Sequence, residues 1–517
     1  MKPIRLMAGF LTVGFWTLMS RILGFVRDIV IAAKLGDGPV AEAFVVAFSL
    51  PNMFRRFFAE GAFNMAFVPI FSKKLESGED PQGFARDAFS GLASILIVFT
   101  LLAQLAMPWL VLAMASGFRA DGRFDIAVEF GRIAFPYILF ISLAALLSGV
   151  LNATGRFVAA AAAPVLLNVI LVSSMLIATL VGGDFGTWLI WAVPVAGIAQ
   201  FVLLWVAASR AGFRLIPRRP VLTPDMRKLA GIALPAMLAG GVVQINLLVG
   251  RQVASYFDGA IQYLNLADRL YQLPLGVVAI AIGVVLLPDL SRRLAADDTE
   301  GGSRAFNRAT EFALLLTVPA AVALVAVAEP IVSVLYQRGA FSAQAAARTA
   351  EVTTIYGLGL PAFVLQKVLQ PLYFARHDTK TPFHFAVVAM VINAVVAIAG
   401  SFLIGFYAAA WATTLAAWAM VVLLWLGSRD MGDAARVDAR LRRRAGRILI
   451  ASLAMGAVLL GTESLLGDWL YTQHVRFLAL ALLVGSGIVS YFAVAQLIGA
   501  ASLGEIRRSM RRGAKTD

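Results

Sequence analysis

Two long apolar segments near the start of the chain each carry a pair of arginines close to their centres. The first contains Arg21 and Arg27, and the second contains Arg55 and Arg56. Each segment is long enough to cross a bilayer, which takes about 20 apolar residues. A central arginine that faces lipid costs about 2.5–3.5 kcal/mol. We therefore expect all four guanidinium groups to face protein or a water-filled cavity.

Nearby acidic residues allow a purely structural role for two of these arginines. Asp28 lies seven residues after Arg21, on the same face of a helix. Glu60 lies four residues after Arg56, a spacing at which helical side chains pair. These pairs would neutralise two of the four cations.

In this scheme Arg27 and Arg55 lack a local carboxylate, although Glu42 could reach one of them. Ionisable groups inside membrane helices usually mark substrate or ion pathways. We therefore favour a functional cationic cavity over purely structural pairing.

The composition is that of a polytopic membrane protein. Of 517 residues, 60% are hydrophobic and only 14% are charged. The chain has no cysteine and only three scattered histidines, so we expect neither disulfides nor a metal site, and no cofactor. We predict an all-α fold with fourteen spans, roughly 7–33, 42–71, 87–114, 126–151, 158–181, 187–209, 228–256, 261–290, 308–336, 348–375, 382–404, 406–427, 447–467 and 477–499.

The placement of positive charge predicts the topology. The formal net charge is +14, and most lysines and arginines lie in segments on the same side as both termini. The positive-inside rule then places both termini in the cytoplasm. The basic stretches 440–447 and 506–515 are most simply topology signals with some contact to anionic lipid, so a nucleic-acid partner is not expected.

An internal duplication of about 220 residues runs through the chain. PIFSKKL at 69–75 matches PDLSRRL at 288–294, and LPN at 50–52 matches LPL at 273–275. Two further matches are Pro108 with Pro330 and Pro136 with Pro361. Six spans per repeat make the repeats parallel, an arrangement found in transporters.

The duplication predicts two parallel six-helix lobes around a central cavity, followed by two extra helices. The expected parts are an N-lobe at 1–210, a cytoplasmic linker at 211–228, a C-lobe at 229–428, a basic cytoplasmic linker at 429–447, and a final helix pair with a basic tail at 448–517. A solute site is expected near the midplane between the lobes.

Further charges lie inside other predicted spans. Span 4 carries Glu129 and Arg132, and the second lobe carries Arg251, Lys367 and an adjacent Asp268–Arg269 pair. We expect these charges to be buried within their spans. Because Arg251 and Lys367 have no acidic residue nearby in the sequence, we expect the cavity to be net positive. Such a cavity suits an anionic solute, and the planar fork of arginine suits phosphate oxygens.

Four stretches of the chain are distinctive, namely SRILGFVRD, AEAFVVAFSLPNMFRRFFAEGAFNMAFVPIFS, ADRLYQLPLGV and RHDTKTP. They closely resemble the MurJ (MviN) family of lipid II flippases, within the multidrug/oligosaccharidyl-lipid/polysaccharide exporter superfamily. The resemblance implies fourteen helices and transport of a lipid-linked peptidoglycan precursor to the outer leaflet of the bacterial cytoplasmic membrane by alternating access, for cell wall biosynthesis. The implied partners are lipid II (an undecaprenyl-diphosphate-linked muropeptide) and membrane lipids, while contact with cell-wall synthesis proteins is left open.

The resemblance and the charge pattern together name the candidate substrate-binding residues. They are Arg21, Arg27, Asp28, Glu42, Arg55, Arg56, Glu60, Arg251, Arg269 and Lys367. Glu42 stands where the family has an aspartate, which keeps the charge on a longer arm. No catalytic residue is expected, because the resemblance implies a transporter and not an enzyme.

Some members of the family resemble sodium-coupled transporters, with carboxylates in spans 7 and 11. Here residues 230–256 and 382–404 contain no Asp or Glu, and Asn393 is the polar oxygen in the second range. We therefore expect dependence on membrane potential. The alternative function is export of another polyprenyl-linked oligosaccharide, or drug antiport within the same superfamily.

Overall fold

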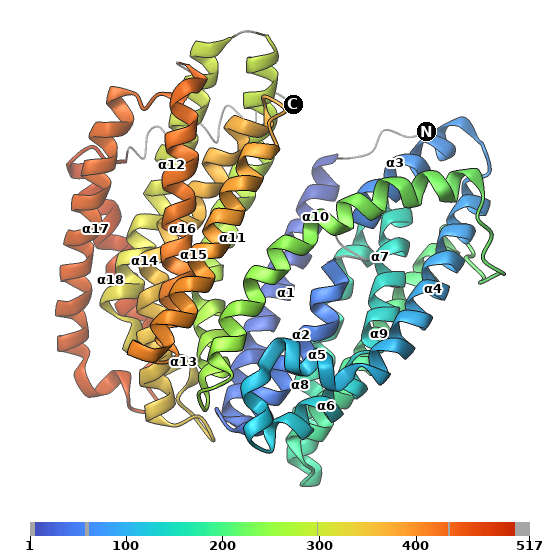
Figure 1. Ribbon diagram of the computed structural model, residues 1–517. Helices are drawn as coiled ribbons and strands as arrows, with labels where there is room; N and C mark the ends of the chain where they lie inside the picture. The colour runs from blue at the N-terminus through green and yellow to red at the C-terminus, as the bar shows by residue number, and fades with distance from the viewer. Residues whose placement is uncertain (1–5, 57–61, 297, 433–434, 502–517) are drawn as a thin grey trace. The chain divides into compact units, whose positions relative to one another are not determined.

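The computed structural model describes residues 6–56, 62–296, 298–432 and 435–501, with side chains left out at 6–11, 62–65, 235–247, 277–288, 294–295 and 430. Within these ranges every regular element is a helix (Figure 1). The all-α prediction is therefore confirmed. The chain forms two compact units, and each is described by itself.

The first unit takes the chain through Gln262, together with Arg338–Phe341. Its helices are α1 (Leu6–Leu35), α2 (Pro39–Arg55), α3 (Ala62–Ser77), α4 (Pro81–Leu105), α5 (Met107–Ala115), η2 (Ser116–Ala120), α6 (Arg123–Ala134), α7 (Tyr137–Ala153), α8 (Phe157–Val181), α9 (Phe185–Arg210) and α10 (Pro224–Ala254). Within this unit α1 packs along α8, and α7 and α8 both pack on α9.

The second unit takes Tyr263–Gln337 and the chain from Ser342 onward. Its helices are α11 (Ala260–Ala295, whose first turn belongs to the first unit), α12 (Thr299–Ala326), α13 (Ala328–Tyr336), α14 (Ala343–Phe374), α15 (Lys380–Ile404), α16 (Tyr407–Ser428), η3 (Arg429–Met431), α17 (Ala439–Leu466), η5 (Gly467–Leu470) and α18 (Arg476–Leu497). In Figure 1, α17 lies beside α12 and α18. An apolar cluster that includes Val327, Met455 and Tyr491 joins these helices.

Short polar side chains start several of the helices. Asp80, Asp184, Thr223, Asp298 and Ser342 are N-caps, and each accepts a hydrogen bond from the backbone N–H three residues further on. Such a cap stabilises a helix by about 1 kcal/mol, because it satisfies an N–H that has no partner within the helix. These helix starts therefore follow from local sequence.

Matching helix breaks support the internal duplication. α4 gives way to α5 at Ala106, and α12 gives way to α13 at Val327. Pro108 and Pro330 lie just after these breaks, and the short second helices are both nine residues long. Proline lacks an N–H and disfavours a continuing helix, so equivalent prolines produce equivalent breaks.

The other proline match behaves differently in the two halves. Pro136 is one of the two residues between α6 and α7, where the helix is interrupted. Its counterpart Pro361 lies inside the continuous helix α14. The two repeats therefore share their order of helices but not every bend.

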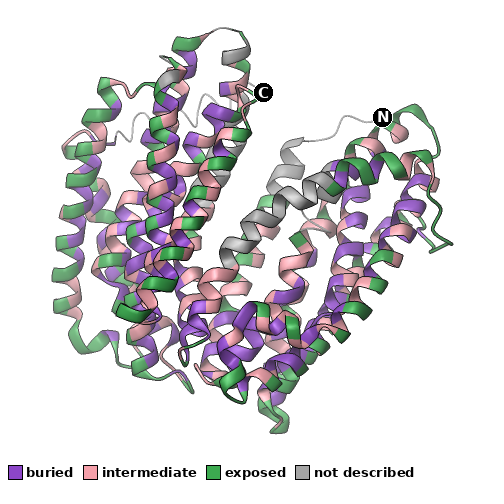
Figure 2. Ribbon diagram, in the orientation of Figure 1, coloured by how far each residue is buried: buried purple, intermediate pink, exposed green. Residues whose placement is uncertain are grey.

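Many helices expose apolar side chains along their length. Leu180, Phe402, Leu465 and Leu497 are each at least 85% exposed, and one side of α17 is exposed throughout (Figure 2). Among the described residues, ten helical segments are long and apolar enough to cross a membrane. Apolar surface on this scale is typical of contact with lipid. The predicted count of fourteen spans stays a prediction.

The helix α10, which we expected to open the second lobe, is grouped with the first unit. Asp225 in its first turn pairs with Lys74 of α3 at 2.9 Å, and Gln252 in its last turn bonds to the end of α5. The two units are defined by which residues contact one another, whereas the predicted lobes are defined by the internal duplication. The predicted lobe boundaries therefore stay a prediction.

Candidate functional site

Arg27 is buried in the first unit and bonded to two side chains. It lies on α1 and is 7% exposed. Its Nε and Nη2 both donate to Oδ1 of Asp28, at 3.0 and 2.7 Å, and its Nη1 donates to Oδ1 of Asn168 at 3.0 Å. We call Arg27, Asp28, Asn168 and Phe48 the Arg27 cluster.

Asn168 ties this cluster to two helices. It lies on α8, is 5% exposed, and its Nδ2 donates to the backbone oxygen of Ser20 on α1 at 3.0 Å and to that of Pro164 on α8 at 3.3 Å. The ring of Phe48 on α2 lies below the guanidinium, with 5.8 Å between the guanidinium carbon and the ring centroid. Three helices therefore meet at one buried arginine.

The expected pairing of the first arginines is wrong in one respect. We expected Asp28 to pair with Arg21, and we expected no local carboxylate for Arg27. In the structure Asp28 pairs with its neighbour Arg27, and Arg21 is exposed on α1. The seven-residue spacing allows a pair with Arg21, but burial of Arg27 makes the adjacent carboxylate the better partner, since a buried cation without one is costly.

The sequence allowed Glu42 to reach Arg27 or Arg55, and the structure gives it other partners. It is 1% exposed on α2, and its Oε2 accepts from Nη1 of Arg123 on α6 at 2.8 Å. Its Oε1 accepts from the backbone N–H of Ile261, in the first turn of α11, at 3.1 Å. The side chain of Glu42 therefore joins three helices within the first unit.

Arg123 is a residue that the sequence analysis missed. It is 5% exposed, it also bonds to Asp121 at 2.6 Å, and Asp258 lies 3.2 Å away. Its guanidinium carbon lies 4.6 Å from the ring centroid of Phe118. We call Glu42, Asp121, Arg123 and Asp258 the Arg123 cluster. The sequence feature that could have identified Arg123 is its position directly after the turn residues Asp121 and Gly122.

The hydrogen bond from Arg123 lowers the pKa of Asp121 below its ordinary value of 3.8. Asp121 lies in the connection before α6, and its side chain is 39% exposed. The bond favours the ionised form of the carboxyl, and its limited burial opposes this only in part. Asp121 is therefore ionised at neutral pH.

Gln252 on α10 caps the end of α5. Its Nε2 donates to the backbone oxygens of Leu112 and Ala113, both at 2.7 Å, and its Oε1 accepts from the N–H of Ser116 at 2.9 Å. Ser255 accepts from the N–H of Gly117 at 2.9 Å. These bonds satisfy helix-end groups that have no partner within α5, and they fasten the last turn of α10.

The remaining candidate residues are placed as follows. Arg55 is half-buried at the last position of α2, Arg56 is exposed, and Glu60 lies outside the described residues. Arg251 is half-buried on α10. In the second unit Arg269 is half-buried on α11 and Lys367 is exposed on α14.

Glu129 and Arg132 were expected to be buried charges of span 4, and this is wrong. Both are exposed on α6. The short helix α6 ends just before Pro136, and its buried face is made by Ala127, Val128 and Phe130. Polar residues on the opposite face of such an amphipathic helix stay exposed.

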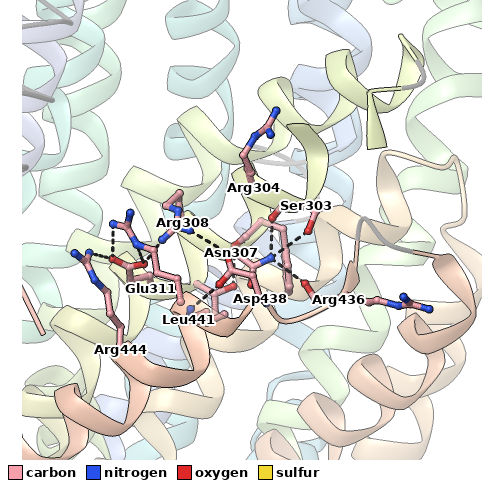
Figure 3. A network of polar contacts seen from close by, with 12 residues as sticks. Ser303, Arg304, Asn307, Arg308, Glu311, Arg436, Asp438, Leu441 and Arg444 are labelled. Atoms are coloured by element: carbon pink, nitrogen blue, oxygen red, sulfur yellow. Dashed lines mark hydrogen bonds and ion pairs between the residues drawn. The ribbon is translucent and has the colours of Figure 1, made fainter. Parts of the chain in front are cut away.

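The second unit also contains a buried carboxylate (Figure 3). Glu311 on α12 is 8% exposed and bonds to Arg308, Arg440 and Arg444. We call these four residues, with Asn307 and Asp438, the Glu311 network. Since Arg440 and Arg444 lie on α17, the network joins α17 to α12.

Asn307 and Asp438 complete this network. Asp438 caps α17 by accepting from the N–H of Leu441 at 2.6 Å, and it accepts from Nη2 of Arg308 at 2.9 Å. Asn307 donates to the backbone oxygen of Arg436 and accepts from the N–H of Asp438, both at 2.9 Å. We interpreted the basic stretch 440–447 as a topology signal with some contact to anionic lipid, and the structure adds this packing role for Arg440 and Arg444.

No group of three or more His, Asp or Glu side chains able to hold a metal ion occurs in the described part of the chain. The clusters pair arginines with carboxylates or amides. An arginine held in this way, such as Arg27, has N–H donors that can form charge-assisted hydrogen bonds to an anion.

Comparison with known proteins agrees with these features. The family model described as "Lipid II flippase MurJ" matches residues 31–480. A protein of Rhizobium meliloti (strain 1021) named "Probable lipid II flippase MurJ" is 44% identical, over 98% of this chain and 96% of that protein. A protein of Rhizobium tropici with the same name is 42% identical, over 97% and 96%.

Solved structures show the same fold. A lipid II flippase MurJ in an inward closed conformation matches with a TM-score of 0.79 and 25% identity, over 94% of this chain and 98% of that one. A multidrug resistance MATE family transporter in an inward-facing conformation matches with a TM-score of 0.66 and 12% identity, over 82% and 98%. The second match shows similarity of fold alone.

Proposed function

Because this chain belongs to the lipid II flippase MurJ family, we propose that it moves lipid II from the inner to the outer leaflet of the bacterial cytoplasmic membrane by alternating access, for cell wall biosynthesis. The protein spans the membrane many times. We propose that both of its termini lie in the cytoplasm. It acts as a transporter and not as an enzyme. The identity over nearly the whole length of the curated relatives supports this function.

The observation that carries the proposal is the buried Arg27 on the 30-residue helix α1. The undecaprenyl diphosphate group of lipid II has two anionic phosphates, which lose water when they enter the membrane. Buried guanidinium groups replace that hydration with charge-assisted hydrogen bonds. Asp28 and Asn168 hold the guanidinium of Arg27 at its buried position by hydrogen bonds.

The proposed substrate-binding residues are those that the sequence named, with one change of role. The cations Arg21, Arg27, Arg55, Arg56, Arg251, Arg269 and Lys367 provide positive charge for the diphosphate. Glu42 has Arg123 and the N–H of Ile261 as partners. We therefore propose that Glu42 positions α2 and does not contact substrate.

The Arg27–Asp28 pair allows a test that separates substrate binding from a structural role. The variants are Arg27→Ala, Asp28→Ala and the double variant, and the readouts are membrane abundance and lipid II in the outer leaflet. If Arg27 contacts the diphosphate, Arg27→Ala abolishes flipping, and the double variant, which leaves no stranded carboxylate, stays inactive at normal abundance. A double variant that flips normally would show that the pair is structural.

A second experiment tests the substrate. Purified full-length protein in proteoliposomes should move lipid II between leaflets. Movement of another polyprenyl-linked oligosaccharide or of a drug, without movement of lipid II, would favour the alternative functions. Applying a membrane potential with and without a sodium gradient would then identify the energy source, for which we propose the potential.

A further inference from the structure

We propose that Asn168 is a positioning residue for transport: it directs the terminal nitrogens of Arg27 toward the substrate diphosphate. This inference rests on the proposed function, since it names a residue that acts through Arg27. Asn168 itself contacts the guanidinium and the backbone of α1, and it contacts substrate only through Arg27.

The hydrogen bonds of Arg27 define which of its N–H groups a substrate can use. A guanidinium has five N–H donors. Asp28 accepts from Nε and Nη2, and Asn168 accepts from Nη1. Within the contacts described for Arg27, one N–H remains on each terminal nitrogen. Two such donors in one plane match two phosphate oxygens, or one oxygen shared between them.

Asp28 alone would not fix this direction. It is the next residue on the same helix, so it holds only the Nε side of a long, flexible side chain. Asn168 comes from another helix and is itself fixed by donating to the backbone oxygens of Ser20 and Pro164. The two partners therefore hold the guanidinium plane from both of its sides.

The neutral amide of Asn168 is important for the affinity of the cluster for an anion. A second carboxylate at this position would give Arg27 two negative neighbours and would repel a phosphate. An amide oxygen accepts the same hydrogen bond without adding charge. The ring centroid of Phe48, 5.8 Å from the guanidinium carbon, adds a weak cation–π contact that also carries no negative charge.

The test is a double-mutant cycle on binding of undecaprenyl diphosphate to the purified full-length protein in detergent. Asn168→Leu keeps the size of the side chain and removes the acceptor. We expect it to weaken binding roughly 10-fold, as for loss of one hydrogen bond to a charged group. In the Arg27→Leu background the same change should alter binding less than about twofold, since sites that act through each other are not additive.

A matched control uses another buried amide that also bonds to α8. Gln200 on α9 is 1% exposed, and its Nε2 donates to the backbone oxygen of Ala163 at 2.8 Å without touching Arg27. Gln200→Leu should change thermal stability but not binding of the diphosphate. If Asn168→Leu does not accumulate, Asn168→Ser gives the same comparison with a smaller side chain.

The outcomes separate this inference from the proposed function. An equal loss of binding from Asn168→Leu with and without Arg27, or unchanged binding, would overturn the positioning role. A wild-type protein that neither binds the diphosphate nor moves lipid II would instead overturn the proposed function. A third outcome would show that only the role of Asn168 is wrong. In that outcome the wild type moves lipid II, Arg27→Leu abolishes the movement, and Asn168→Leu leaves the movement intact.

Discussion

Nη1 of Arg123 lies 2.8 Å from Oε2 of Glu42, and both side chains are almost fully buried. The two residues come from α6 and α2 and are 81 positions apart in the chain. Removing one partner of a buried pair costs about 3–5 kcal/mol, because the other charge is left in a poorly hydrated place. The pair therefore fastens α2 to α6 within the first unit.

We expect Arg123→Met to lower thermal stability and membrane abundance strongly, since it strands the carboxylate of Glu42. Glu42→Gln combined with Arg123→Met should recover most of that loss, because no buried charge then remains. Thermal unfolding of the purified variants measures both effects. A double variant that is as unstable as the sum of its single changes would contradict this account.

The lowered pKa of Asp121 predicts how acid affects the Arg123 cluster. A carboxyl with a folded-state pKa below its unfolded value stabilises the fold above the unfolded value and loses this contribution as the pH falls through the folded one. For Asp121 the loss therefore begins below its ordinary pKa of 3.8. Asp121→Asn should be less stable than the wild type at pH 7, and the difference should shrink below about pH 4. A difference that stays constant with pH would argue against the ion pair.

Gly117 lies where the chain after α10 passes closest to α5. A Cβ there would lie 2.5 Å from the backbone carbon of Ser255 and 2.6 Å from the nitrogen of Tyr256. Because backbone atoms cannot move aside easily, Gly117→Ala should destabilise the protein by about 1–3 kcal/mol. Gly122→Ala is the control, since a Cβ there meets nothing within 4 Å. Equal stability of the two variants in thermal unfolding would show that the contact is loose.

Glu311 provides a prediction for the second unit. Glu311→Gln leaves three arginines with a neutral partner, and it should cost about 1.5–3 kcal/mol, as for loss of hydrogen bonds to a charged group. Glu300→Gln on the same helix is the control, because its pair with Arg304 is exposed and such pairs contribute about 0–1 kcal/mol. Proteolysis near residues 436–444 should increase only in Glu311→Gln. Unchanged protection there would contradict the role of the network in holding α17.

The proposed topology can be tested with single cysteines, because the natural chain has none. Suitable positions are exposed ones, namely Ala120, Gln344, Arg219 and Arg442. A reagent that cannot cross the membrane should label the first two from outside intact cells and should leave the last two unlabelled. The opposite pattern would reverse the assigned orientation.

The sequence by itself determined most of the helices and their interruptions. Predicted spans such as 158–181 and 382–404 agree with α8 and α15 to within a few residues. Asp and Ser N-caps and the prolines at 108 and 330 act on the backbone within one or two turns. Signals of this kind need no knowledge of the rest of the fold.

Only the tertiary structure decided which charges meet. The sequence left Arg27 without a local carboxylate, whereas in the structure it bonds to Asp28 and to Asn168 on α8, 141 residues away. The sequence also allowed Glu42 to reach Arg27 or Arg55, and its partner in the structure is Arg123 on α6. Which partner wins depends on burial and on how helices pack, because a buried charge is stable only beside the group that packing brings to it. The stabilisation of these buried charges comes largely from partners that are distant in sequence, so no local pattern along the chain predicts it.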